Sequence, residues 1–228
     1  MRLGAIIILG LAVVSASTLL GLDHASAQTR CTDEVEPPTV SVTLYPRNVA
    51  FSTAKSRDDL THRFNESNAT KLHPNARALG LTGGTLASET QFKHLVVTRP
   101  SGAICGYLRD VSITLGIQTL EVFVARDYAP GSCEYEAVVR HEAEHVDIHY
   151  RTLDEYAPRI ARELAAGLQR RPWTMNFSVE EVENTFRERT DIERLSSFKR
   201  MMRTLDRRHG AIDTPESYRR TRMQCSNW

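Results

Sequence analysis

The chain has 228 residues, of which 41% are hydrophobic and 25% are charged, and its formal net charge is +1. A chain of this length suits one domain with a single hydrophobic core. Its near-zero net charge excludes a general electrostatic attraction to nucleic acid or to a membrane surface.

The N-terminus is typical of a secretory signal. An apolar run over residues 3–22 is followed by Ala-Ser-Ala at positions 25–27, which matches an Ala-x-Ala cleavage site. We predict that residues 1–27 are removed and that the mature chain, residues 28–228, is periplasmic or secreted, without stable membrane insertion. The apolar run is also long enough to span a bilayer, so an uncleaved anchor is the alternative.

Period-two alternation of apolar residues predicts strands in the first part of the mature chain. A short helix is expected over residues 57–64, and Thr82-Gly83-Gly84 is typical of a turn. Short connections between the last three strands indicate an antiparallel meander. The predicted strands cover residues 40–51, 93–98, 104–115 and 119–125.

Helix formers dominate from residue 134 onward, with apolar residues three and four apart. Pro158 is a good first helical residue, Ser178 offers a capping box with Glu181, and Gly210 can supply a C-terminal cap. The sequence therefore predicts one α+β domain, sheet-rich over residues 38–126 and helical over 134–228. Its predicted helices cover residues 135–153, 158–168, 178–209 and 215–225.

The four cysteines, Cys31, Cys105, Cys133 and Cys225, all lie in the exported part of the chain. An even number of cysteines in an oxidising compartment predicts two disulfide bonds. Of the three possible connectivities we favour Cys105 with Cys133 and Cys31 with Cys225. Buried free thiols are the alternative.

The C-terminal part is rich in arginine over residues 187–222. Acidic residues are interleaved with these arginines, including Glu188, Asp191 and Asp206. Such a pattern is typical of a solvated helix face rather than of a nucleic-acid surface. We therefore expect no nucleic-acid partner.

Residues 140–150, RHEAEHVDIHY, contain a His-Glu-x-x-His (HExxH) motif formed by His141, Glu142 and His145. Residues four apart lie on one helix face about 6 Å apart, so both imidazoles can bind one metal ion. Glu142, rotated by about 100°, can reach a metal-bound water without being a ligand. In zinc hydrolases zinc lowers the pKa of this water to about 7, and the glutamate takes its proton. The alternative is a polar helix face with two surface histidines.

Neither of two further polar residues on the same helix is expected to bind the metal. His149 lies eight residues beyond His141, about 12 Å along a straight helix, which is too far for one tetrahedral ion. We expect it at the surface or behind the ligands. Asp147 points away from the ligand face, and we expect it to anchor the helix to the rest of the fold.

The third ligand is therefore expected from farther along the chain. His209 would complete a three-histidine site, and Glu163 would complete a His/His/Glu site. The alternatives are a cationic residue near a helix C-terminus for His209 and a solvated glutamate for Glu163.

Several motifs together resemble the exported bacterial family catalogued as domain of unknown function 922. Its members are described as predicted zinc-dependent proteases, so the resemblance implies zinc and favours His209 as the third ligand. In the family a Tyr-Asp pair lies several residues before the distal His-Gly, whereas here Leu205-Asp206 lies only three residues before His209. The motifs are Cys105 leading into strands over 111–124, Cys133, the helix motif with Asp147-Ile148, and Asp206-x-x-His209-Gly210.

We thus predict an exported Zn²⁺-dependent hydrolase, a zincin-like metallopeptidase acting on a protein or peptide. Its site is expected to consist of His141, His145 and His209 as ligands and Glu142 as the catalytic base. The alternative is a non-catalytic periplasmic or envelope binding protein with a structural or vestigial metal site. Glu142 favours the enzyme, because a binding module has no use for a base beside the ligands. The sequence identifies neither a particular substrate nor an oligomeric state.

Overall fold

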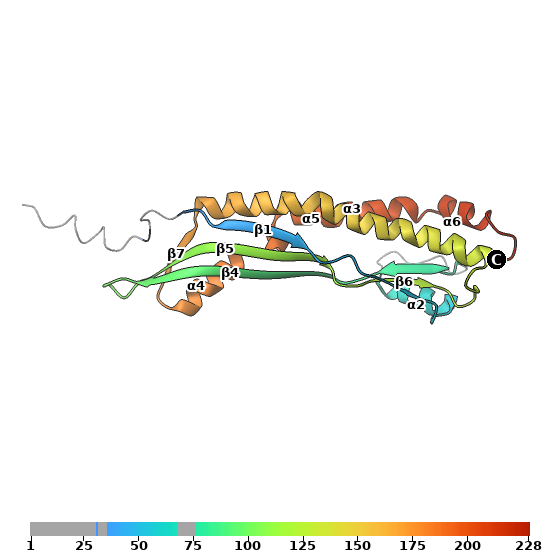
Figure 1. Cartoon of the computed structure of the whole chain (residues 1–228), viewed down its shortest axis with the longest axis horizontal. Helices are drawn as coiled ribbons and strands as arrows, with labels where there is room; N and C mark the ends of the chain where they lie inside the picture. The colour runs from blue at the N-terminus through green and yellow to red at the C-terminus, as the bar shows by residue number, and fades with distance from the viewer. Residues whose placement is uncertain (1–30, 32–35, 68–75) are drawn as a thin grey trace, which may run out of the picture.

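The computed structural model describes residues 31, 36–67 and 76–228, which form five α-helices and two β-sheets in an elongated molecule (Figure 1). The α+β composition predicted from the sequence is confirmed. The predicted secretory signal, residues 1–27, lies outside the described residues.

The first sheet has the strand order β1 (Thr39–Leu44), β5 (Ile104–Ile117) and β4 (Leu86–Thr98). A further strand, β7 (Trp173–Asn176), pairs with the first residues of β5. β5 runs parallel to β1 and antiparallel to β4. Alternate residues of β5 are buried on one face of the sheet, where the helices cover it.

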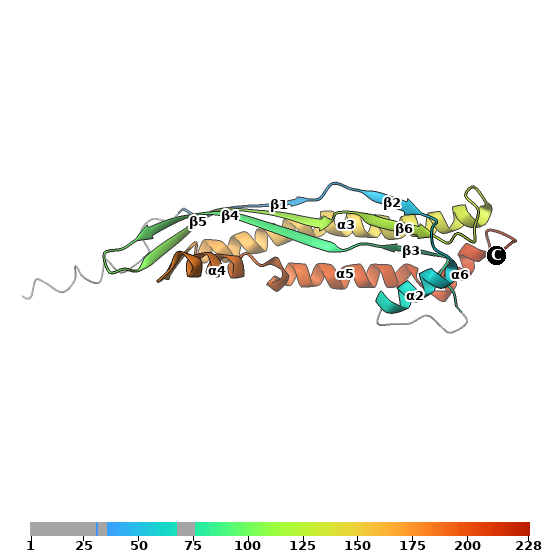
Figure 2. The same cartoon turned by 90° about the horizontal axis from the view of Figure 1, so that it is seen from below.

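The second sheet has the order β2 (Val49–Ser52), β6 (Leu120–Val124) and β3 (Gly80–Gly83). β1 leads into β2, β5 into β6, and β3 into β4, so the two sheets are halves of one interrupted ribbon (Figure 2). At the interruption Pro46 has no N–H to donate, and Gly116 adopts a φ of 137°.

The predicted antiparallel meander is correct only for β4 and β5. β6 does not fold back on β5, because residues 118–119 carry the chain onward into the second sheet. β1 pairs with β5 in the parallel direction, which periodicity alone does not specify. The predicted turn at Thr82-Gly83-Gly84 is also wrong, because Thr82 and Gly83 belong to β3.

A single helix of 38 residues, α3 (Cys133–Arg170), replaces the two helices predicted over 135–153 and 158–168. Pro158 removes one backbone hydrogen bond inside it, at a cost of about 3 kcal/mol. The helix continues because neighbouring side chains such as Tyr156 and Ile160 are buried in the core. α3 is about 57 Å long and runs along both sheets (Figure 1).

The helix predicted over 178–209 is interrupted. α4 (Val179–Arg189) and α5 (Ser196–Ile212) are separated by a 3₁₀ turn at Ile192–Arg194. The Asp191 side chain accepts a hydrogen bond from the backbone of Glu193, which favours the turn over a continued helix. Ser178 caps α4 by accepting from Glu181 N–H, as predicted. Gly210 does not end α5, which continues to Ile212.

The last helix, α6 (Pro215–Arg222), begins after Thr214, close to its predicted start. α2 (Arg57–Ser67) confirms the short helix predicted in the first half of the chain. Leu60 of α2 packs with Phe123 of β6 and Val138 of α3 in a small core beneath the second sheet.

The main core lies between the first sheet and helices α3, α4 and α5. α5 runs alongside α3 (Figure 2), and Met201 from α5 and Phe186 from α4 are fully buried. Their apolar neighbours in this core include Leu108, Val111, Ile113, Leu115, Leu153, Ile160 and Leu164.

A carboxylate from α3 caps the first turn of α5. Leu195 at the N-cap makes no side-chain cap hydrogen bond, and Glu163 accepts from the backbone N–H groups of Ser196 and Ser197 at 2.9 and 2.8 Å. Hydrogen bonds from Ser197 and Ser196 lower the pKa of Glu163 from 4.5 to about 2. Glu163 therefore joins α5 to α3.

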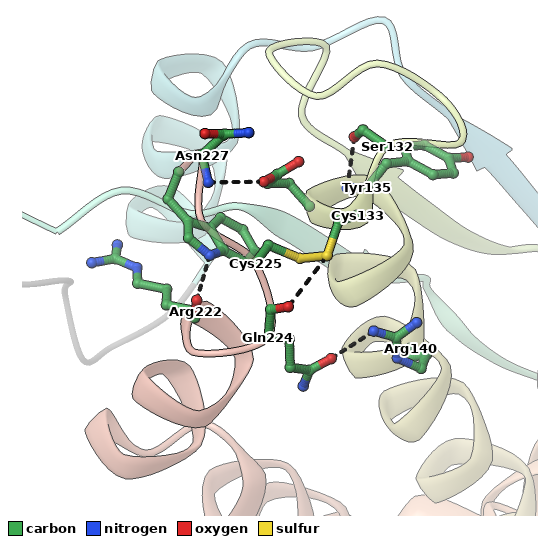
Figure 3. The surroundings of a disulfide bond; sticks show 10 residues. Ser132, Cys133, Tyr135, Arg140, Arg222, Gln224, Cys225 and Asn227 are labelled. Carbon is green, nitrogen blue, oxygen red and sulfur yellow. Dashed lines mark hydrogen bonds between the residues drawn. A yellow bond between two sulfur atoms is a disulfide. The ribbon is translucent and has the colours of Figure 1, made fainter.

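The two disulfides join Cys31 to Cys105 and Cys133 to Cys225, and the structure describes no free cysteine. The predicted number is confirmed, but the predicted pairing of Cys105 with Cys133 is wrong. Cys105 is the second residue of β5 and Cys133 is the first residue of α3, and β5 and β6 carry the chain along the molecule between them. The Cys133–Cys225 bond fastens the C-terminal segment to the first turn of α3 (Figure 3).

Two disulfides are compatible with an oxidising, exported location. Among residues 31, 36–67 and 76–228, no helix combines the length and apolar character needed to cross a bilayer.

Peptide mapping without reduction is expected to recover two linked pairs, Cys31 with Cys105 and Cys133 with Cys225. Replacing both Cys133 and Cys225 with serine should lower the free energy of unfolding by about 2–5 kcal/mol, because a constraint on the unfolded chain is lost. A peptide linking Cys105 to Cys133 in the unreduced sample would contradict the structure, and the reduced sample serves as control.

Glu163→Gln is expected to lower the free energy of unfolding by about 1 kcal/mol at pH 7, because a charged cap is lost. The folded pKa of Glu163 is depressed, so its stabilisation is complete above pH 4.5 and is lost as the pH falls toward 2. Urea titrations of both proteins at pH 7 and pH 2.5 measure this difference. A difference that stays the same at both values would contradict the capping role.

Candidate metal centre

Both motif histidines lie on the buried face of α3 in its first half. They are four residues apart, and their ring centroids are 5.0 Å apart. Their Nε2 atoms converge on one oxygen, Oδ1 of Asp213, at 3.3 Å from His141 and 3.2 Å from His145. The helix motif therefore presents the two imidazoles together, as the spacing predicts.

Asp213 is the residue at which α5 ends. It is the C-cap of α5, and its backbone N–H donates to the carbonyl of His209. Tyr218 of α6 donates its hydroxyl to Asp213 Oδ1 at 2.7 Å. The Tyr218 ring also lies 5.4 Å from the ring of His141, centroid to centroid. The junction of α5 and α6 thus aims this carboxylate at α3.

His141, His145 and Asp213 together could hold a metal ion. One ligand atom from each lies within 4.8 Å of the others, and this is the only such group of three or more in the part of the chain that the structure describes. Two imidazole nitrogens and one carboxylate oxygen are ligands that zinc accepts in tetrahedral sites. The donor set therefore fits zinc, with a fourth position left for water or substrate.

The charges of this group are tightly coupled. Burial by itself lowers the pKa of His141, but the hydrogen bond to Asp213 and the charge of Glu142 raise it overall. Burial by itself raises the pKa of Asp213, yet hydrogen bonds from His141 and His145 hold it well below its usual range. Asp213 is therefore ionised at neutral pH, as a metal ligand must be.

Glu142 lies on the same turn of α3 but outside the ligand group. The residue is 4% exposed, and its Oε2 accepts a hydrogen bond from the hydroxyl of Thr82, on β3, at 2.7 Å. A Cβ at Gly80 would lie only 2.5 Å from Glu142 Oε1, so the glycine leaves room for the carboxylate. Burial raises the pKa of Glu142. β3 thus fixes the position of a buried, basic carboxylate.

His209 contacts the metal centre through the other ring nitrogen of His145. The two Nδ1 atoms are 2.8 Å apart, so one of them donates to the other. If His145 uses Nε2 as ligand, its Nδ1 carries the proton and His209 accepts it. Burial and then the charge of His145 lower the pKa of His209 to about 4, which suits a neutral acceptor. Asp213, and not His209, lies beside the Nε2 atoms of both His141 and His145.

The sequence also led to expectations for three other residues of α3, namely Glu163, Asp147 and His149. Glu163 lies 22 residues after His141 on the same helix, about 33 Å away, so it is wrong as a ligand. Asp147 does not anchor α3, because it is half exposed and pairs with Arg151 on the same helix. His149 lies behind the ligands, with its ring 4.4 Å from that of His209.

Asp213 is the member of this candidate ligand group that the sequence did not single out. Its position before Thr214-Pro215 is typical of a helix start. The sequence therefore suggested a role for Asp213 in starting a helix and not as a candidate metal ligand. The one available signal was a carboxylate four residues after His209 at a junction between two helices.

Two cavities flank the centre along α3. One, of about 260 Å³, is lined by His141, Arg140 and Glu144 of α3 and by Arg220 of α6. The other, of about 220 Å³, lies one turn beyond His145 and is lined by His149 and His209. The first cavity therefore touches one candidate ligand, His141, and the second touches His209, the partner of His145.

The chain matches no family model, and no curated protein or solved structure is significantly similar to it. The geometry of the site is therefore what indicates a function for this chain.

Asp213→Asn and His141→Ala are expected to lower Zn²⁺ affinity more strongly than His209→Ala. The first two changes remove a ligand, whereas loss of a partner behind a ligand lowers affinity by about 10–100-fold. Glu163→Ala should leave binding unchanged, because it lies far from the centre. Competition with a chromophoric chelator measures all four variants. Unchanged affinity in Asp213→Asn with complete loss in His209→Ala would restore the three-histidine site.

Proposed function

We propose that the protein is an exported zinc-dependent peptidase, with His141, His145 and Asp213 as ligands and Glu142 as base. The observation that carries this proposal is the convergence of three ligand atoms within 4.8 Å, beside a buried glutamate on the same helix turn. A structural metal site has no need for the glutamate, whereas hydrolysis requires a base beside the metal.

The site is zincin-like in our proposal. A helix carrying two ligands and the base packs against a sheet, and a later part of the chain supplies the third ligand. Zinc held there would supply a Lewis acid that polarises a carbonyl and makes a bound water acidic. The identity of the metal rests on the His/His/Asp donor set.

Glu142 is placed to move a proton in this proposal. Burial raises its pKa, which makes the ionised carboxylate a stronger base, and Thr82 holds one of its oxygens. Peptide hydrolysis joins the oxygen of water to the carbonyl carbon and breaks the C–N bond. Glu142 takes a proton from the water and delivers it to the leaving nitrogen.

In this proposal Tyr218 and His209 orient the ligands and do not contact the reacting carbonyl of the substrate. Tyr218 donates to Asp213 and restricts its carboxylate, and its pKa is raised by burial and by the charge of Asp213. His209 accepts from Nδ1 of His145 and so selects the tautomer whose Nε2 can bind a metal. Both are positioning residues.

Export and substrate class are part of the same proposal. Two disulfides fit an oxidising compartment. In this proposal the cavity at His141 and the cavity at His209 take residues on the two sides of the cleaved bond. A protein or peptide substrate has this form.

Glu142→Gln is expected to keep zinc and to lower peptide hydrolysis by about two to four orders of magnitude, because only the base is removed. The measurement is cleavage of a proteome-derived peptide library by the zinc-loaded protein, read by mass spectrometry, together with zinc content. Glu136→Gln, an exposed change on the first turn of α3, is the matched control and should cleave like the wild type.

If zinc-loaded wild type and Glu142→Gln are equally inactive on the library, the peptidase proposal fails. The non-catalytic envelope protein with a structural metal site then becomes the better interpretation. Equal activity in the two proteins would instead place the hydrolysis at another site or in a contaminant.

A further inference from the structure

The cavity beyond His145 has mainly apolar walls. It lies between α3, α5 and the junction of the two sheets, near Leu86 and Ile117. Its volume is about 220 Å³. This is below the range of about 300–1,000 Å³ that is usual for sites of whole small molecules. The space is therefore suited to one side chain. Its apolar walls are formed by Leu86, Ile117, Leu153, Met202 and Leu205.

The same cavity is adjacent to the metal centre. His149 follows His145 by one turn, which corresponds to a rise of about 6 Å, and the stacked rings of His145 and His209 lie 5.0 Å apart. One residue of an extended peptide covers about 3.3 Å. A peptide with a bond at the centre can thus place the side chain of an adjacent or next residue in the cavity.

Two buried ring nitrogens at this cavity have no hydrogen-bond partner among the described residues, namely His149 Nδ1 and His209 Nε2. If His209 accepts from His145 at Nδ1, its Nε2 carries a proton. Both nitrogens are covered in this structure, so a backbone oxygen of a peptide could accept from one of them only after the ring becomes accessible.

We propose that this cavity is the specificity pocket of the peptidase and takes an apolar side chain, of leucine or phenylalanine size, beside the cleaved bond. Gly84, Asp206 and the two histidines form the rest of its lining, which contains no lysine or arginine to attract an acidic side chain. The position of the pocket beside a cleaved bond rests on the proposed peptidase function. Occupation of the pocket by an apolar side chain is testable separately.

The first experiment identifies the cleavage sites of the zinc-loaded protein in the peptide library. One position next to the cleaved bond should be enriched in leucine, methionine or phenylalanine. Met202→Trp, which fills the cavity from a half-buried wall position, should lower cleavage at these residues by at least about 10-fold relative to sites with glycine or alanine. Met223→Trp, the same change at a residue that is 78% exposed, should leave the preference unchanged.

A second variant protects this test against misfolding. Leu205→Ala enlarges the cavity and should shift the preference toward larger aromatic residues, while circular dichroism checks that both wall variants are folded. Cleavage by the wild type without an apolar preference, or with a preference that neither folded wall variant changes, would overturn the inference and leave the peptidase proposal standing.

The second experiment needs no turnover. N-acetyl-phenylalaninamide is titrated into Glu142→Gln protein carrying labelled methionine methyl groups, and N-acetyl-glycinamide is the control ligand. The Met202 methyl should shift with the first ligand, whereas Met223 should not, and Met202→Trp should weaken binding at least about 10-fold. Binding without any cleavage by the wild type would uphold the pocket and end the peptidase proposal. No shift at Met202 would overturn the inference whatever the activity.

Discussion

α3 must remain one helix through Pro158, and the rest of the structure depends on this. Its first half carries His141 and His145 beside the second sheet, and its second half packs against the first sheet in the main core. A break at Pro158 would let the two halves of the ribbon move independently. Burial of Tyr156 and Ile160 offsets the lost backbone hydrogen bond, so the core that forms far from the centre also holds the centre in place.

Two carboxylates at the centre have opposite properties because their surroundings differ. Asp213 accepts hydrogen bonds from His141, His145 and Tyr218, which keep it ionised. Glu142 is more deeply buried, and burial raises its pKa. Environments that push the pKa values of two neighbouring groups apart are typical of sites that separate a ligand from a base. This separation supports the roles that we propose for them.

The C-terminal segment completes the centre although it is last in the chain. α5 runs back along α3, and Glu163 of α3 caps its first turn. Its other end delivers Asp213, and α6 then supplies Tyr218. The Cys133–Cys225 bond fastens the segment after α6 to the start of α3 (Figure 3). The candidate third ligand is thus positioned locally, by the junction of α5 and α6 and by the disulfide bond that follows it.

The sequence by itself determined the local features: an amphipathic helix with His141, Glu142 and His145 at fixed spacing, the cap at Ser178, and strands with alternating burial. These follow from helix and strand geometry over a few residues. Only the tertiary structure decided that β1 is parallel to β5, that Pro158 lies inside a helix, which cysteines pair, and that Asp213 meets the histidines. Each of these depends on contacts between residues far apart in the chain, and burial there outweighs local preferences such as that of Pro158.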